Sequence, residues 1–178
     1  PAFTMKHYDF ADRFRALSDQ AVKLYASGKT GADGYFTADE AAFLAANGLS
    51  AQNLADYAED HNDYGEPGYD RALAIELVRR DYFLNAQGGR PSGKVIDAAT
   101  MPAKTDTVRG IGWLPRLIPK AKAKLRGELP AGLMYSCGGD RAFFRQHDIH
   151  PAEFLSLVWR YENNDTAIID WVVQRIQS

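Results

Sequence analysis

Apolar residues recur at helical spacing along most of the chain. The first set lies three or four residues apart: Phe10, Phe14, Leu17, Ala21 and Leu24. This spacing predicts an amphipathic helix over residues 8–26 that ends near Gly28. Strand patterns are weak. The strongest covers residues 95–97 and the second strongest covers residues 132–136, and neither is expected to make a sheet.

Capping residues mark the starts of further helices. Thr37 followed three residues later by Glu40 is a capping box, which predicts a helix that stops at Asn47-Gly48. Ser50 is expected to cap a helix over 51–59, followed by a polar loop, HNDYGEPG. The remaining helical patterns cover residues 69–85, 115–126, 140–147, 151–161 and 166–177, the last capped by Asp165.

The stretch from residue 87 to residue 112 is rich in Gly, Pro and Thr and has no helical periodicity. Such a length without regular structure is typical of a linker or a functional lid. We therefore predict a helical lobe over 1–86, a linker or lid loop over 87–112, and a second helical lobe over 113–178. One compact domain is the alternative.

The two predicted lobes match one another at an offset of 100 residues. The positions that coincide are Leu17, Ala21, Tyr35, Ala42 and Phe43 with Leu117, Ala121, Tyr135, Ala142 and Phe143. The order of caps and apolar positions is also shared, so we predict an internal duplication. The expected fold class is all-α, with two pseudo-equivalent helical lobes joined by a long irregular loop.

The composition of the chain mainly excludes classes of protein and partner. Apolar residues make up 46% and charged residues 25% of the chain, which favours a packed fold over disorder. A formal charge of -2 gives no global attraction for nucleic acid or an anionic membrane, so neither partner is expected. With a single cysteine and no apolar secretory core in PAFTMKHYDF, the expected location is cytoplasmic.

Two segments resemble known ligand-binding loops but lack residues that those loops need. Counted from Lys29, the segment ending at Glu40 matches the second half of a calcium loop, but Lys29 and Gly31 occupy the first two ligand positions. GGRPSGKV resembles a phosphate-binding loop, yet Val95 replaces the hydroxyl that ligates magnesium. Calcium binding is therefore a distant third hypothesis, and no metal or cofactor is expected.

Charged residues supply the candidate chemistry. Glu76 and Arg80 lie four residues apart inside an apolar arc, which predicts a partly buried ion pair with either a structural or a ligand-binding role. His61 and Tyr64 lie in the polar loop before that helix, and a histidine there is a plausible acid or base.

Cys137 precedes a helix that Asp140 is expected to cap. A cysteine in that place can be a nucleophile, but His147 and His150 lie beyond the far end of the helix, so a small half-buried cysteine is the default. The basic residues of the preceding helix, such as Lys120 and Lys124, are interpreted as mostly solvated.

The segment GWLPRLIPKAKAKLRGELPAGLMYSCGGDRAFFRQHDIHPAEFLSLV resembles a bacterial family known as a domain of unknown function. The residues that carry the resemblance are Trp113, Leu114, Pro115, Arg116, Lys120, Lys124, Gly127, Tyr135, Asp140 and Arg141. EDHNDYGEPGYDRALAIELVRRDYFLNAQ is similar to the family's first half, so the resemblance covers most of the chain. It implies a soluble, mostly helical bacterial protein and supplies no activity.

The leading hypothesis is a small-molecule enzyme without a cofactor, of lyase or isomerase type, that acts on a small anionic or polar substrate between the lobes. Arg80 and Arg116 are expected to hold the anion, with His61 or Tyr64 transferring the proton. The remaining substrate-binding candidates are Glu76, Trp113, Arg116, Tyr135 and Asp140. The alternative is a noncatalytic regulatory module that binds a protein or a ligand.

Overall fold

The computed structural model describes residues 5–178, and these fold into eight α-helices with one two-stranded hairpin. The all-α class expected from the periodicity is confirmed. The chain divides into two compact units, Pro1–Glu76 (unit 1) and Leu77–Ser178 (unit 2), whose boundary falls within helix α4 (Tyr69–Asp81). The predicted division at residues 86 and 113 stays a prediction.

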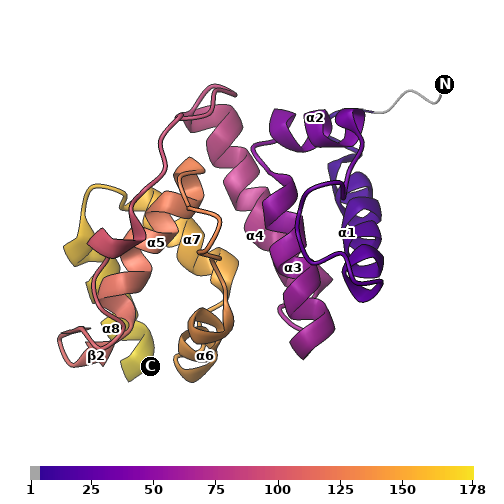
Figure 1. Cartoon of the computed structure of the whole chain (residues 1–178). Coiled ribbons are helices and arrows are strands. Elements are labelled where there is room, and N and C mark those ends of the chain that lie inside the picture. Colours follow the sequence, from indigo (N-terminus) through magenta and orange to yellow (C-terminus); the bar gives the residue numbers. More distant parts are fainter. Residues whose placement is uncertain (1–4) are drawn as a thin grey trace. The chain divides into compact units, whose positions relative to one another are not determined.

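Unit 1 is built on α1 (Phe10–Ala26) and α3 (Ala51–Tyr64), which lie side by side in Figure 1. Helix α2 (Ala38–Ala46) and the start of α4 complete the unit. Its buried apolar side chains include Phe10, Phe14, Leu17, Ala21, Leu44, Leu54 and Ala58. Removing this surface from water is the main stabilising contribution to such a small helical core.

Unit 2 continues from α4 into a π-helical turn, Tyr82–Ala86, and then an irregular segment. That segment contains a 3-10 turn at Ala98–Thr100 and a hairpin of β1 (Thr107–Val108) and β2 (Ile111–Gly112). The remaining helices are α5 (Leu114–Arg126), α6 (Gly138–Gln146), α7 (Pro151–Arg160) and α8 (Asp165–Gln177). Helices α5 and α7 pack together and bury Leu117, Ala121, Leu125, Phe154, Leu155 and Val158.

The capping predictions are confirmed at two helix starts. Thr37 accepts the Glu40 amide at 3.2 Å, while the Glu40 carboxylate accepts the Thr37 amide at 2.9 Å. Ser50 and Asn53 form the same reciprocal pair at the start of α3. Each pair satisfies amides that have no partner within the helix, and so fixes where the helix begins.

Several predicted boundaries are wrong. Helix α3 continues to Tyr64 instead of ending at residue 59, and it stops at Gly65, whose φ of 71° is the left-handed conformation that glycine adopts freely. Asn164, not Asp165, caps α8, because its side chain accepts the Ala167 amide at 3.1 Å. The expectation that neither weak strand pattern makes a sheet is confirmed, but a short hairpin lies in the segment expected to be irregular.

The 100-residue offset recurs in the helix bounds. Helix α2 covers 38–46 and α6 covers 138–146, while α3 begins at Ala51 and α7 at Pro151. The caps differ, because Thr37 forms a capping box whereas the Cys137 side chain makes no capping hydrogen bond. Common ancestry of the two halves stays a prediction.

No helix among residues 5–178 is both long and apolar enough to cross a lipid bilayer.

We expect the stability of unit 1 to fall in acid through Glu40. The amide of Thr37, a hydrogen-bond donor, lowers the pKa of Glu40 below the usual 4.5. A carboxylate with a lowered folded-state pKa stabilises the protein fully above the unfolded value, and that stabilisation is lost as the pH falls through the folded value. Chemical denaturation of wild type and Glu40→Gln should therefore show a difference at neutral pH that shrinks below pH 4.5.

The matched control is Asp39→Asn, which removes an exposed carboxylate from the same first turn of α2. Its difference from wild type should depend less on pH. Equal pH dependence of the two variants would show that the general field of the helix end, not the bonds to Thr37, is responsible.

Candidate functional site

A buried polar cluster of unit 2 surrounds the carboxylate of Asp140, in the first turn of α6. Lys120 Nζ from α5 lies 2.7 Å from Asp140 Oδ2, and Trp113 Nε1 donates to Oδ1 at 2.8 Å. The amide of Ser136 also donates to Oδ2, at 2.9 Å. The side chains of Lys120 and Asp140 are only 4% and 0% exposed, so this is a buried ion pair with further hydrogen bonds.

The local sequence explains how α6 begins so close to Trp113. At Gly139 an added Cβ would lie 2.4 Å from the Trp113 ring, so a side chain there would displace the indole. Trp113 and Ser136 both have positive φ, at 69° and 68°, which turns the chain sharply before α5 and before α6. These features let the indole reach the Asp140 carboxylate.

Cys137 is the N-cap residue of α6, but its side chain makes no capping hydrogen bond. Instead, Lys120 Nζ lies 3.2 Å from Cys137 Sγ. The same lysine therefore contacts both the thiol and the Asp140 carboxylate. Cys137 is half-buried, whereas Lys120 is buried. We call Trp113, Lys120, Ser136, Cys137 and Asp140 the Asp140 cluster.

Tyr135, which precedes Ser136 in the chain, is buried. Tyr135 donates its hydroxyl to the carbonyl of Pro151 at 2.7 Å. Burial, with the Asp140 charge adding to it, raises the pKa of Tyr135 well above its usual value. Tyr135 therefore stays protonated near neutral pH and is not suited to proton transfer.

Unit 1 holds a counterpart of the cluster at the 100-residue offset. Gln20 stands where unit 2 has Lys120, and its Nε2 lies 3.5 Å from Glu40 Oε1. Thr37 and Glu40 stand where unit 2 has Cys137 and Asp140. The counterpart therefore lacks both the amine and the thiol.

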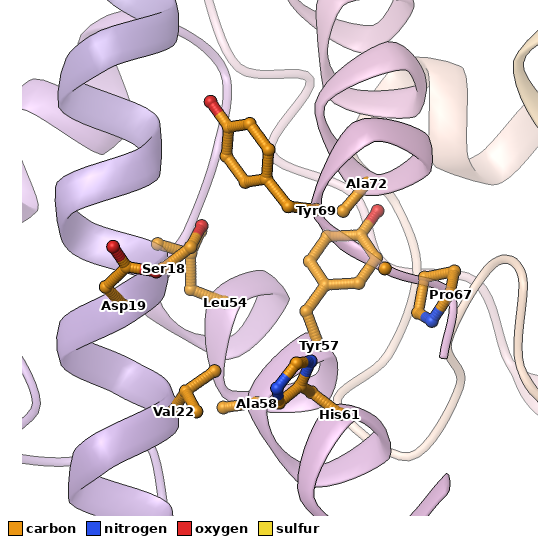
Figure 2. A pocket seen from close by; sticks show the side chains of 11 residues that line it. Ser18, Asp19, Val22, Leu54, Tyr57, Ala58, His61, Pro67, Tyr69 and Ala72 are labelled. Atoms are coloured by element: carbon orange, nitrogen blue, oxygen red, sulfur yellow. The ribbon is translucent and has the colours of Figure 1, made fainter. Parts of the chain in front are cut away.

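A pocket of about 90 Å³ lies in unit 1, between α1, α3 and the start of α4. Its polar side chains come from Ser18, Asp19, Tyr57, His61 and Tyr69. Figure 2 shows Ser18, Asp19 and Val22 of α1 on one side, Pro67 on the other, and the Tyr57 ring between them. The remaining lining residues are Leu54, Ala58, Gly68 and Ala72.

The two tyrosine hydroxyls of the pocket lie close to polar groups of the protein. Tyr69 donates to the carbonyl of Ala11 at 2.9 Å, and the Arg15 guanidinium lies 4.8 Å from the Tyr69 ring centre. Tyr57 Oη lies 3.4 Å from Glu76 Oε1. His61 lies one helical turn after Tyr57, lines the pocket and is exposed to solvent.

The other predicted site residues lie elsewhere in the two units. Tyr64 is 70% exposed and does not line the pocket. Glu76 is buried, and burial lowers the pKa of Arg80. Arg116 donates to the carbonyl of Pro102 at 3.0 Å. The Glu76–Arg80 ion pair and the shared anion site of Arg80 and Arg116 stay predictions.

One interpretation of the second half is corrected: Lys120 and Lys124 are buried rather than solvated, at 3% and 6% exposure. Cys137 is half-buried, as expected, and it contacts Lys120. The two histidines have other contacts: His147 packs against the Phe143 ring, and His150 caps α7 by accepting the Ala152 amide. Burial also lowers the pKa of His147.

The match to known families falls on the half that holds the Asp140 cluster. Residues 100–178 match the domain of unknown function DUF5069. This DUF5069 region contains the whole cluster, whereas the pocket of unit 1 lies outside it. The match covers residues 100–178, whereas the resemblance expected from the sequence extends over most of the chain. No curated protein and no solved structure matches the chain.

We expect the buried ion pair of Lys120 and Asp140 to make a large contribution to the stability of unit 2. Asp140→Asn removes the charge that compensates Lys120, and breaking a buried pair costs roughly 3–5 kcal/mol. Asp170→Asn is the control. Asp170 pairs with Arg109 at the surface, where the side chains of Arg109 and Asp170 are 46% and 50% exposed. Exposed ion pairs of this kind contribute about 0–1 kcal/mol to stability. Urea denaturation measures the free energy of unfolding of both variants. Similar losses in the two variants would contradict the expected importance of the buried pair.

We also expect the pocket to accept added side-chain volume. Ala58 lines it, whereas Ala55 is a buried alanine of the same helix that does not. Overpacking a filled core costs about 1–3 kcal/mol, so Ala55→Leu should be clearly destabilising and Ala58→Leu less so. Thermal and urea denaturation test this order, and a larger loss for Ala58→Leu would show that the pocket is not open to a ligand.

Proposed function

We propose that the chain binds a small molecule in the pocket of unit 1 and exchanges a proton with it through His61. The observation that carries this proposal is that a histidine and aromatic side chains line one pocket of about 90 Å³. Concave, largely apolar sites with a few placed polar groups are the usual form of a small-molecule site.

The lining defines the ligand class. None of the residues that line the pocket is a lysine or an arginine, while Asp19 is an acid, so an anion finds no compensating charge there. Of the two substrate classes expected from the sequence, we therefore propose the polar, uncharged one. The volume is smaller than a cavity of roughly 150 Å³ that holds benzene, so the ligand, or the part of it that enters, has only a few non-hydrogen atoms.

The proposed reaction is proton transfer of the lyase or isomerase type. Histidine changes charge near neutral pH and is the commonest general acid or base. His61 contributes to the pocket from α3, whose N-terminal capping box fixes the start of the helix. The alternative, a noncatalytic regulatory module, uses the same pocket without needing His61 for turnover.

We also propose that the two halves descend from one duplicated segment and that the protein works in the cytoplasm. The coincident helix bounds of α2 with α6 and of α3 with α7 support the duplication. The use of one cysteine in 178 residues supports the location.

A fluorinated fragment library, observed by ¹⁹F NMR, tests binding. Fragments that bind wild type should lose binding in Ala58→Leu, where the new side chain fills the pocket, and keep it in Ala55→Leu. Binding that is equal in both variants would place the fragments elsewhere and overturn the pocket assignment.

Small ketones such as acetone then test the chemistry, because exchange of their carbon-bound protons in D₂O requires an acid or base. We expect exchange above the solvent rate, reduced on the order of 100-fold or more in His61→Gln with fragment binding retained. His150→Gln, which changes an exposed histidine in unit 2, should leave the rate unchanged. Binding without accelerated exchange would favour the regulatory module.

A further inference from the structure

The contact between Cys137 and Lys120 is not used by the proposed function, which lies in unit 1. Sγ and Nζ are 3.2 Å apart, and both belong to unit 2. The lysine is held in place by Asp140, at 2.7 Å. A thiol and an amine are thus kept together by a buried ion pair, so their separation does not depend on chance encounters of flexible side chains.

Both chemical access and the lack of a competing partner favour reaction between these two groups. Cys137 is half-buried, so part of the residue is accessible to a small oxidant. The chain has no second cysteine, so an internal disulfide cannot form. The group in contact with the sulfur is the amine of Lys120.

We propose that Cys137 and Lys120 form an oxidative cross-link, in which hydrogen peroxide joins Sγ and Nζ through one oxygen atom. The modification site comprises the thiol, the amine and the Asp140 carboxylate. It is independent of ligand binding in unit 1.

The chemistry balances with peroxide as the only oxidant. The first peroxide oxidises the thiol: a sulfur–oxygen bond forms, the peroxide oxygen–oxygen bond breaks, and water leaves, giving a sulfenic acid. The Asp140 carboxylate accepts a proton from the Lys120 ammonium, which leaves a neutral amine whose nitrogen lone pair is free to react. A nitrogen–oxygen bond then forms, one N–H and the sulfenic O–H are lost, and a second peroxide is reduced to two waters.

The geometry favours a bridging oxygen over a direct sulfur–nitrogen bond. An inserted oxygen needs only a small change in the 3.2 Å separation, whereas a direct bond draws both atoms to single-bond distance. Such a movement would pull Lys120 away from Asp140 inside a packed interior, where displaced charges are costly.

The neighbouring Ser136 supplies a second, independent observation. Its hydroxyl is fully buried and has no hydrogen-bond partner among the described residues. Buried hydroxyls are normally satisfied, and an unsatisfied one calls for an explanation. An oxygen added at the adjacent residue introduces a new hydrogen-bond acceptor into these surroundings.

Mass spectrometry of the peroxide-treated wild-type chain tests the proposal directly. The expected product gains one oxygen and loses two hydrogens, and protease digestion yields a peptide that joins Lys120 to Cys137. Treatment with dithiothreitol should restore the starting mass. The measurement needs no variant, so it does not depend on whether a change at Lys120 folds.

Variants then assign the two ends. Cys137→Ser and Lys120→Arg should both lose the cross-linked product, and Lys120→Arg keeps a cation near Asp140. Lys122→Arg, on the same helix but paired with the exposed Asp165, should keep the product. A product that gains oxygen alone, one that only loses two hydrogens, an intermolecular disulfide, or a link to another lysine would each overturn the proposal.

Discussion

The burial of the Asp140 carboxylate is the constraint on which the arrangement of α5 and α6 depends. A carboxylate removed from water costs several kcal/mol unless a counter-charge and hydrogen bonds compensate it. Here Lys120, the Trp113 indole and the Ser136 amide all do so. Each of these contacts requires a particular chain path: a sharp turn before each helix and no side chain at Gly139. The same ion pair holds the Lys120 amine against the thiol at the start of α6, so the packing requirement and the proposed reactivity share one cause.

Helix starts could be predicted from the sequence because their cause is local. The Thr37 and Ser50 caps bond to residues three positions away, and both are found as expected. The predicted end of α3 is wrong because its last residues are polar, and polar residues are common in loops as well as on exposed helix turns. Those residues lie on exposed turns of the helix, where the Asn62 side chain bonds to the carbonyl of Ala58, and only Gly65 breaks the pattern. A stop residue was therefore a better guide than composition.

The chemistry of the sites was only partly accessible, because it depends on contacts between distant elements. His61 could be identified from its residue type, but its pocket depends on side chains from α1 and α4 that no short pattern connects. The Cys137–Lys120 contact joins residues 17 positions apart. One signal was available: Lys120 follows the buried Leu117 by three residues and therefore shares its helix face, which argued against solvation.

Under the proposed duplication, corresponding positions of the two units begin helices in both but carry different chemical groups. Thr37 and Cys137 both begin a helix, and Glu40 and Asp140 both accept an amide that precedes it. A hydroxyl is a good acceptor and is consumed by capping, whereas a thiol is a weak one and caps nothing here, so Cys137 remains in contact with Lys120. Gln20, the counterpart of Lys120, donates to the carbonyl of Tyr35 at 2.8 Å and offers no nucleophilic amine. In the proposed cross-link, the amine and the thiol are therefore the features that distinguish unit 2 from the corresponding positions of unit 1.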